Sequence, residues 1–306
     1  MSDSSPCAVI DVGSNTVRLL VAVPHGGELS TLIDDSAFVR LGSGVDETGA
    51  LNPERERAAV EAIERMAALA RSLGANPVLS IATSAVRDAS NRNGFIQEVR
   101  QRSDVEVEVI SGEREAELTY RGATLGMEVE GPVIVCDLGG GSAELIHADE
   151  SGMRWARSLP LGSGRLSERF VRHDPPHAAE QEDIRSYVTS ELRRLPQARA
   201  DTVVLTGGTA KHVAFLAGAE GTKVVLDRGA LDRVQHLVCS LSAEAVVERY
   251  GVEPERARVL PAGITALQAI AAYYEASQVV ITWQGIREGT IVDYLERAGR
   301  WPSHQR

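Results

Sequence analysis

Two stretches of the sequence, 126 residues apart, share one pattern, and this repeat restricts the fold more than any other feature. In each, an apolar run ends in an aspartate and is followed by a glycine turn and a second apolar run: CAVIDVGSNTVRLLV and VIVCDLGGGSAELI. Apolar, β-branched runs on either side of a glycine turn predict a β-hairpin. Asp11 and Asp137 occupy equivalent positions, and the seventh residue after them is Arg18 or Glu144, respectively. An internal repeat of this length predicts two related domains.

Alternating strand and helix patterns around the two hairpins place the chain in the α/β class. The clearest helix starts after Asn52, a favourable N-cap residue, with Pro53 at its first position and an apolar stripe that continues to Leu73. A second hairpin is expected within 32–41. Further strands are expected at 78–82, 105–110, 202–205 and 278–282, and further helices near 93–102, from 112, at 178–194, from about 210, and at 231–241, 242–250, 254–256, 264–275 and 286–298. We expect domains at 1–126 and 127–306, with the last helix, about 286–300, able to pack back on the first domain.

The charge balance excludes one class of partner. Of the 306 residues, 43 are acidic and 32 are basic, which gives a net charge of −11. An acidic chain is poorly suited to nonspecific binding of nucleic acids or anionic membranes, because both need a basic surface. The same argument favours a neutral or cationic ligand. No apolar run approaches the roughly 20 residues of a membrane-spanning helix, and the short acidic N-terminus does not resemble a signal peptide.

The cysteines indicate the redox compartment. Cys7, Cys136 and Cys239 are widely spaced and form no Cys-x-x-Cys pair, and the first two lie inside apolar runs. This pattern predicts small, buried, reduced core residues. Reduced cysteines are typical of a reducing compartment, so we expect a cytoplasmic protein.

Three glycine turns follow predicted strands, at 13–15, 139–142 and 207–209. Glycine lets backbone N–H groups approach an anion, and neighbouring hydroxyl groups add donors, so such turns often bind phosphate. A hairpin that needs a positive φ explains any single turn, but the three together favour phosphate binding.

Asp11 and Asp137 end buried-looking strands, where a carboxylate needs a cation or hydrogen-bond donors. We expect them to bind a Mg²⁺ ion or to orient its waters. The glycine spacing fits neither a Walker A nor a Rossmann motif.

Six segments carry a resemblance to a known family, in this order between about residues 7 and 295: AVIDVGSNTVRLLV, ATSAVRDASN, ISGEREAELTYRG, VIVCDLGGGSAELI, VVLTGGTAKHVA and GIREG. Together they resemble the exopolyphosphatase and guanosine pentaphosphate phosphohydrolase (Ppx/GppA) family of the actin-like (ASKHA) superfamily. The resemblance implies two actin-like, ribonuclease H-like α/β domains with an active-site cleft between them. Longer family members carry a C-terminal HD-type helical domain. This chain ends before such a domain and resembles the short, two-domain form.

The resemblance implies a catalytic base. Glu115 takes the position of the glutamate that orients and deprotonates the attacking water. By sequence alone Glu113 and Glu117 are alternatives, and any acidic residue at a helix start also has a structural explanation, because it interacts favourably with the helix dipole.

The resemblance also implies metal and phosphate ligands. Asp137 and Glu144 match the carboxylates that bind Mg²⁺, with Mn²⁺ as the alternative ion, and Asp11 is a third candidate. Arg87 matches the arginine that binds substrate phosphate. The remaining candidates for phosphate binding are Ser14, Asn15, Arg18, Gly139, Gly140, Gly141, Ser142, Gly207 and Gly208. Relatives vary in residue type at the position of Arg18, so the resemblance supports phosphate binding by Arg18 less strongly than by the other residues.

The implied reaction is Mg²⁺-dependent hydrolysis of the terminal phosphoanhydride of inorganic polyphosphate, which releases orthophosphate. The alternative substrate is the 5′ phosphate of guanosine pentaphosphate (pppGpp). An actin-like kinase would share the glycine turns but would not need Glu115 as a base for water. A non-catalytic sensor would bind either ligand and signal by domain closure. A homodimer would be unsurprising for the family. A polyanionic substrate conflicts with the ligand expected from the net charge, unless Mg²⁺ reverses the local sign.

Two histidines lie four residues apart. His173 and His177 would share one face of a helix, but Pro175 and Pro176 between them prevent a helix, so we do not expect a metal pair.

Arg165, Arg169 and Arg172 recur at helical spacing. They could extend a basic track for a long polyanion, and a solvated helix face is the equally good alternative.

Overall fold

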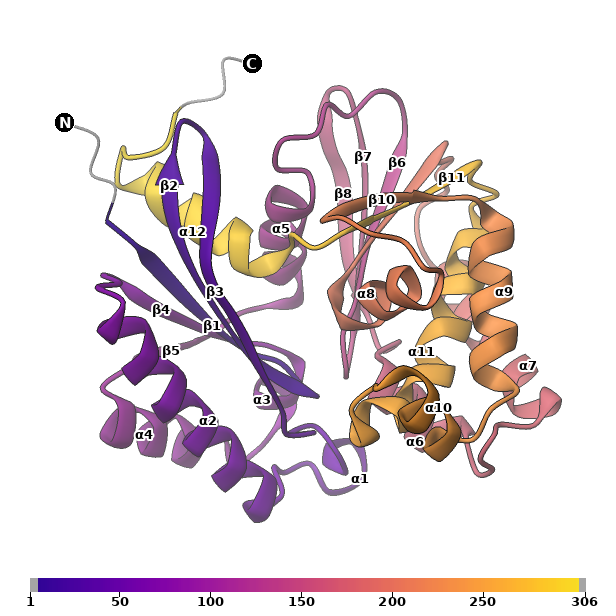
Figure 1. Ribbon diagram of the computed structural model, residues 1–306, viewed down its shortest axis with the longest axis horizontal. Coiled ribbons are helices and arrows are strands. Elements are labelled where there is room, and N and C mark those ends of the chain that lie inside the picture. Colours follow the sequence, from indigo (N-terminus) through magenta and orange to yellow (C-terminus); the bar gives the residue numbers. More distant parts are fainter. Residues whose placement is uncertain (1–4, 303–306) are drawn as a thin grey trace. The chain divides into compact units, whose positions relative to one another are not determined.

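The chain forms two compact units in a computed structural model, which describes residues 5–302 except for the side chain of Arg228 (Figure 1). The first unit contains the chain up to Met127 and the segment from Gln284 onward. The second unit is Glu128–Trp283. The first unit is therefore discontinuous in sequence, and the second is inserted into it.

The first unit is built on a five-stranded sheet in the order β3-β2-β1-β4-β5. Its strands are β1 (Cys7–Val12), β2 (Thr16–His25), β3 (Glu28–Phe38), β4 (Val78–Ala82) and β5 (Val107–Val109). β1, β2 and β3 pair antiparallel, whereas β4 and β5 are parallel to β1. The hairpin expected within 32–41 is wrong, because β3 pairs with β2 as one strand. The turn lies earlier, at Gly26 and Gly27, which both adopt the left-handed φ values that favour glycine.

Helices cover both faces of this sheet. They are α1 (Val45–Thr48), α2 (Pro53–Ser72), α3 (Ser84–Asp88), α4 (Arg92–Ser103), α5 (Gly112–Ala123) and α12 (Ile286–Arg297). The cap predicted for α2 is confirmed: the Asn52 side chain accepts a hydrogen bond from the Glu54 N–H at 2.9 Å, and Pro53 begins the helix. Side chains of α2 and α4 form a core with one sheet face. Side chains of α5 and α12 form a second core with the other face.

Two glycines let α12 pack directly on α5. A Cβ atom on Gly122 would overlap the carbonyl oxygen of Gly285, and one on Gly289 would overlap the carbonyl oxygen of Leu118. The two helices therefore touch backbone to backbone, and α12 also contacts β1. This contact attaches the segment after Gln284 to the first unit, as Figure 1 shows for the yellow helix.

A buried arginine on α12 holds two strands of the sheet. Arg287 is 3% exposed and donates hydrogen bonds to the Leu19 carbonyl at 3.1 Å and to both carboxylate oxygens of Asp34 at 2.6 and 3.1 Å. Burial by itself lowers the pKa of Arg287, but the hydrogen bonds to Asp34 and the charges of Glu288, Asp34 and Asp11 outweigh it, so the pKa is raised. Arg287 is therefore a charged residue inside the core that depends on its carboxylate partner.

The second unit repeats the strand order of the first. Its sheet runs β10-β11-β9-β6-β7-β8. Its strands are β6 (Val133–Leu138), β7 (Ala143–Asp149), β8 (Gly152–Leu159), β9 (Thr202–Thr206), β10 (Lys223–Leu226) and β11 (Gln278–Thr282). Leaving aside the edge strand β10, the third, second, first, fourth and fifth strands lie side by side in both units. The first three are antiparallel and the last two are parallel to the first. The expectation of a repeated α/β fold is confirmed.

Helices of the second unit pack apolar side chains against this sheet: α6 (Ser163–Phe170), α7 (Ala178–Leu192), α8 (Gly207–Leu216), α9 (Arg228–Cys239) and α11 (Pro254–Tyr273). α10 (Ala243–Tyr250) packs on α11 instead. The expectation of two helices at 254–256 and 264–275 is wrong, because α11 is continuous through Pro261. Most of α11 is buried against α6, α7 and α9, and that burial outweighs the roughly 3 kcal/mol that an interior proline costs a helix.

All three cysteines are buried, as predicted, and form no disulfide in the described part of the chain. Burial raises the pKa of the Cys136 thiol well above its usual value, and the charges of Asp137 and Glu144 raise it further. The thiol therefore stays protonated and unreactive. Within residues 5–302, none of the helices has the length and apolar character needed to cross a membrane.

Two adjacent aspartates on β3 test the buried ion pair. We expect Asp34→Asn to lower the free energy of unfolding by about 2 kcal/mol, because breaking a fully buried pair costs about 3–5 kcal/mol and Asp34 is partly exposed. Asp35→Asn is the matched control, since Asp35 pairs with the exposed Arg65, and it should cost less than about 1 kcal/mol. Urea unfolding followed by circular dichroism measures both. Equal losses in the two variants would contradict a special role for Arg287.

Candidate functional site

The first glycine turn joins β1 and β2. Strand pairing places Asp11 directly opposite Arg18, and the Gly13 N–H donates to the Thr16 carbonyl at 3.1 Å to close the turn. Gly13 does not adopt a left-handed φ, so the need for a positive φ does not explain this glycine. Asp11 is 7% exposed and lies near Arg287, whose pKa it helps to raise. Arginines of the first unit therefore balance part of its charge.

Backbone contacts hold this turn in place. The Ser14 hydroxyl accepts a hydrogen bond from the Ala85 N–H at 3.2 Å, and the Ser14 carbonyl accepts one from Gly42 at 2.8 Å. The carbonyl of Asn15 accepts from Val39 and Arg40, both at 2.9 Å. Ser14 and Asn15 are both buried. The turn is thus fixed to the start of α3, which carries Arg87 two residues later.

Arg87 and Glu115 form the central contact of the first unit's candidate site. The Arg87 Nη1 donates to Glu115 Oε2 at 2.9 Å and to the Ile110 carbonyl at 3.0 Å. Ser111 caps α5 by accepting from the Arg114 N–H at 3.2 Å, which places Glu115 in the first turn of the helix. Glu115 is 7% exposed. The structure therefore brings together the predicted base and the predicted phosphate-binding arginine.

The neighbouring glutamates have other environments. Glu113 is exposed, and Glu117 forms ion pairs with Arg114 at 2.7 Å and Arg121 at 3.6 Å. Of the three glutamates, only Glu115 is buried against Arg87. This difference favours Glu115 for the chemical role that sequence alone leaves open between them.

The second glycine turn joins β6 and β7 in the second unit. Strand pairing places Asp137 directly opposite Glu144, so the two carboxylates lie on the same sheet face. Glu144 is 2% exposed, and its Oε1 accepts a hydrogen bond from the Ser158 hydroxyl at 2.7 Å. Like charges directly opposite one another destabilise a sheet unless a cation binds them. Carboxylate oxygens are also the donors that Mg²⁺ prefers, so these two residues fit the implied metal.

The third glycine turn lies against the same aspartate. Thr206 pairs with Asp137 across β9 and β6, and a Cβ atom on Gly207 would collide with the Asp137 carboxylate. Gly207 has a φ of +89°, which glycine adopts without strain. Gly208 follows in the first turn of α8 and is buried, and its carbonyl contacts the ring of His212 at 2.7 Å. The second unit thus brings together Asp137, Glu144 and the third turn.

The start of α6 supports the second turn, a contact that the sequence does not predict. The Ser163 N–H donates to the Gly139 carbonyl at 2.9 Å, and the Gly164 N–H donates to the Gly140 carbonyl at 2.9 Å. A Cβ atom on Gly162 would overlap the backbone of Gly140 and of the next residue. These hydrogen bonds use carbonyl oxygens of the turn. The groups of a turn that are suited to bind an anion are its N–H groups. Only tertiary packing reveals the requirement for Gly162.

The three arginines around α6 have different contacts, and whether they extend a basic track for a polyanion stays a prediction. The Arg165 N–H helps to hold the second turn by donating to Gly140 at 3.1 Å. The Arg169 guanidinium lies over the Tyr187 ring, 4.3 Å from its centroid. Arg172 lies beyond the end of the helix and donates to the Glu168 carbonyl at 2.6 Å. Arg169 and Arg172 therefore have structural contacts within the second unit.

A steric change tests the support of the second turn. We expect Gly162→Ala to lower the free energy of unfolding by about 1–3 kcal/mol, because the added methyl group overpacks a backbone contact. Gly94→Ala is the control: Gly94 lies in α4, and its added Cβ atom would meet open space. That control should lose no stability, since alanine is the better helix former. Thermal unfolding measures both. A stable Gly162→Ala variant would contradict the described packing.

Comparison with known proteins places this arrangement in a family. Residues 20–298 match the model of the Ppx/GppA phosphatase family. Exopolyphosphatase 1 of Mycobacterium tuberculosis is 31% identical over 302 residues, which cover 94% of this chain and 88% of that protein. Guanosine-5′-triphosphate,3′-diphosphate pyrophosphatase of Vibrio vulnificus is 28% identical over 94% of this chain but only 59% of its own length. The crystal structure of the Aquifex aeolicus member of the Ppx/GppA family is 29% identical, with a TM-score of 0.81 over 96% of this chain and 98% of that chain.

The repeated α/β topology of the chain is consistent with the family match and with the similarity to the A. aeolicus structure. The chain belongs to the Ppx/GppA phosphatase family, a family of phosphoanhydride hydrolases.

Proposed function

We propose that the chain is an exopolyphosphatase, which hydrolyses the terminal phosphoanhydride of inorganic polyphosphate and releases orthophosphate. The contact between Arg87 and Glu115 carries this proposal. It joins a buried carboxylate, suited to hold water, to a guanidinium, suited to bind a phosphate group. We place the enzyme in the cytoplasm, where its reduced cysteines would persist.

We choose polyphosphate over pppGpp because the relatives named as exopolyphosphatases are more similar in sequence to this chain. The M. tuberculosis exopolyphosphatase is 31% identical, whereas the V. vulnificus pyrophosphatase is 28% identical. Hydrolysis of the pppGpp 5′ phosphate would use the same chemistry and stands as the second candidate function.

In the proposed mechanism, each residue has a task that its environment favours. Arg87 binds the terminal phosphate and steadies Glu115. Glu115 orients a water molecule in line with the bond that breaks, and it accepts that water's proton. The N–H groups of the first and second turns bind phosphate oxygens, helped by the Ser14, Asn15 and Ser142 side chains. Positioning and charge neutralisation of this kind dominate phosphoryl transfer.

Asp137 and Glu144 would hold Mg²⁺, and Asp11 would orient its waters. When bound, the ion neutralises charge on the phosphate oxygens. The two carboxylates of the second unit lie opposite one another, and the carboxyl of Asp11 faces an arginine instead. This difference supports Asp137 and Glu144 as the direct ligands. Gly207 leaves the Asp137 carboxylate room that a side chain would fill.

A pair of glutamates on α5 tests the proposed base. We expect Glu115→Gln to lower kcat by about a hundredfold or more, because the amide cannot accept the proton from water. Glu117→Gln is the matched control, since Glu117 lies on the same helix in surface ion pairs, and its kcat should stay near that of the parent. Initial rates of orthophosphate release measure both. A Glu115→Gln variant with the parent's kcat would refute the assignment.

A substrate panel tests the reaction class and the metal together. Orthophosphate release should be measured with short and long polyphosphate, pppGpp and ATP, with and without Mg²⁺. We expect polyphosphate to give the highest kcat/KM and Mg²⁺ removal to abolish release. Asp137→Asn should raise the Mg²⁺ concentration needed for half-maximal activity, whereas Asp149→Asn, in the same sheet but paired with Arg154, should not.

The outcomes of the panel separate the alternatives. Preference for pppGpp would favour the second candidate function. Phosphate transfer from ATP only in the presence of an acceptor would indicate a kinase. Binding of polyphosphate without release of orthophosphate from any substrate would indicate a sensor, and would overturn the proposed hydrolase.

A further inference from the structure

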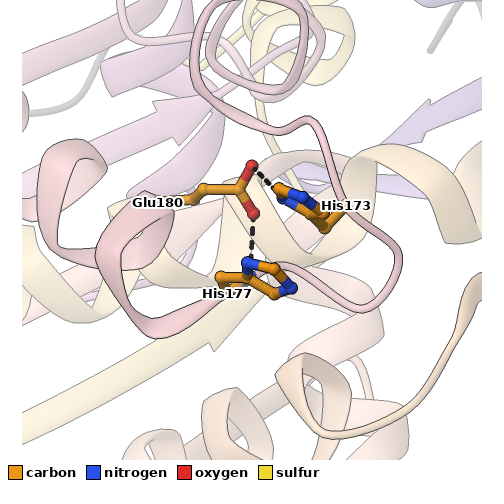
Figure 2. Close-up of side chains that lie close together, drawn as sticks. All are labelled: His173, His177 and Glu180. Carbon is orange, nitrogen blue, oxygen red and sulfur yellow. Dashed lines mark hydrogen bonds and ion pairs between the residues drawn. The ribbon is translucent and has the colours of Figure 1, made fainter.

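A cluster of two histidines and a glutamate lies at the connection between α6 and α7 in the second unit (Figure 2). The rings of His173 and His177 stack, with centroids 3.6 Å apart and planes 14° from parallel. One ring nitrogen of each histidine and one carboxylate oxygen of Glu180 lie within 4.8 Å of one another. The sequence predicts no metal pair here, because prolines prevent a helix between the histidines. The structure brings the rings together without a helix, because the connection before α7 bends at residues 173–175.

Glu180 is a fixed anchor in this cluster. It is 9% exposed, and its carboxylate accepts hydrogen bonds from the N–H groups of Arg172 at 2.6 Å and His177 at 2.7 Å. Burial raises the pKa of Glu180, but these hydrogen bonds and the contact with His173 outweigh it and lower the pKa. The carboxylate is therefore ionised and held in one orientation, as a metal ligand requires.

The donor atoms suit a transition metal ion. The His173 Nδ1 lies 3.1 Å from Glu180 Oε1. Two ligands bound at about 2.0–2.1 Å to a tetrahedral Zn²⁺ ion stand about 3.3 Å apart, so little movement separates this pair from a binding geometry. His173 and His177 are both exposed, so the rings can turn out of their stack to direct their nitrogen lone pairs at one ion.

We propose that His173, His177 and Glu180 form a binding site for Zn²⁺ or a similar divalent transition metal ion. Two imidazole nitrogens and one carboxylate oxygen are a common protein ligand set for zinc, with water in the fourth position. Mg²⁺ prefers oxygen ligands and an octahedral shell, so it competes poorly for such a site. The site shares no residue with the proposed Mg²⁺ ligands Asp137 and Glu144.

The position of this site gives it a structural consequence. His173 follows the end of α6, and Glu180 lies in the first turn of α7. An ion bound there joins the two helices across their connection. α6 begins at the contact that supports the second glycine turn, so the ion would restrain the far end of the same short helix.

Binding of Zn²⁺ to the full chain without a polyhistidine tag tests the proposal. Calorimetric titration in excess Mg²⁺ occupies the carboxylate site and leaves the histidine site to be measured. We expect one Zn²⁺ per chain, with a Kd that rises by more than about tenfold in His173→Gln and in His177→Gln. His25→Gln, which changes another exposed histidine, should keep the parent's Kd. Zn²⁺ should also raise the melting temperature of the parent and not that of the double variant His173→Gln/His177→Gln.

These variants keep the carboxylate of Glu180 and its backbone donors, so the fold should survive, and their circular dichroism spectra should match that of the parent. An unchanged Kd in the double variant would overturn the site. Absence of Zn²⁺ binding to the parent in excess Mg²⁺ would overturn it as well. Neither result depends on polyphosphate hydrolysis.

Discussion

Antiparallel pairing across a short glycine turn is the constraint on which both candidate sites depend. In each hairpin, backbone hydrogen bonds fix which residue lies opposite the aspartate that ends the first strand. The opposite residue is Arg18 in the first unit and Glu144 in the second. A slip of one residue would turn each of these side chains to the other face of the sheet. Strand register therefore determines which charged side chains lie opposite one another in each site.

The same frame carries different charges in the two units. In the first, a carboxylate faces an arginine, and Arg87 holds Glu115, so positive and negative groups lie in contact. In the second, a carboxylate faces a carboxylate, and a third glycine turn leaves space beside Asp137. One unit is thus suited to phosphate and water, and the other to a cation. The net charge of −11 hides this division, because an average over the chain does not describe local groups.

Sequence patterns predict the parts of the fold that depend on neighbouring residues. The two hairpins and the start of α2 follow from strand propensity, turn glycines and the cap at Asn52, which act over a few residues. The continuous α11 contradicts a local rule, because burial of its whole length outweighs the cost of Pro261. The sequence also does not predict β3 as one long strand, because most of its side chains are exposed and its pairing with β2 determines it.

Local sequence patterns also do not predict the contacts within the candidate site. Motif resemblance leads to Glu115, Arg87 and Asp137, but it does not reveal that Arg87 contacts Glu115 or that Gly207 lies against Asp137. Those contacts join residues far apart in sequence, and no local pattern encodes them. His173 and His177 are the opposite case: the local rule about proline correctly excludes a helix, yet the rings meet through another backbone path.

The backbone contact between α5 and α12 has a consequence for biosynthesis. The helix that completes one sheet face of the first unit is encoded after the entire second unit. Residues up to Met127 therefore emerge from the ribosome with the α12 side of that sheet uncovered. The ribosome must then translate Glu128–Trp283 before it synthesises the covering helix. Chains emerge at about 5–20 residues per second, so that surface stays open for roughly 8–30 seconds. During that interval Cys7, Val9 and Leu20, which α12 later covers, are apolar surface that a chaperone could bind.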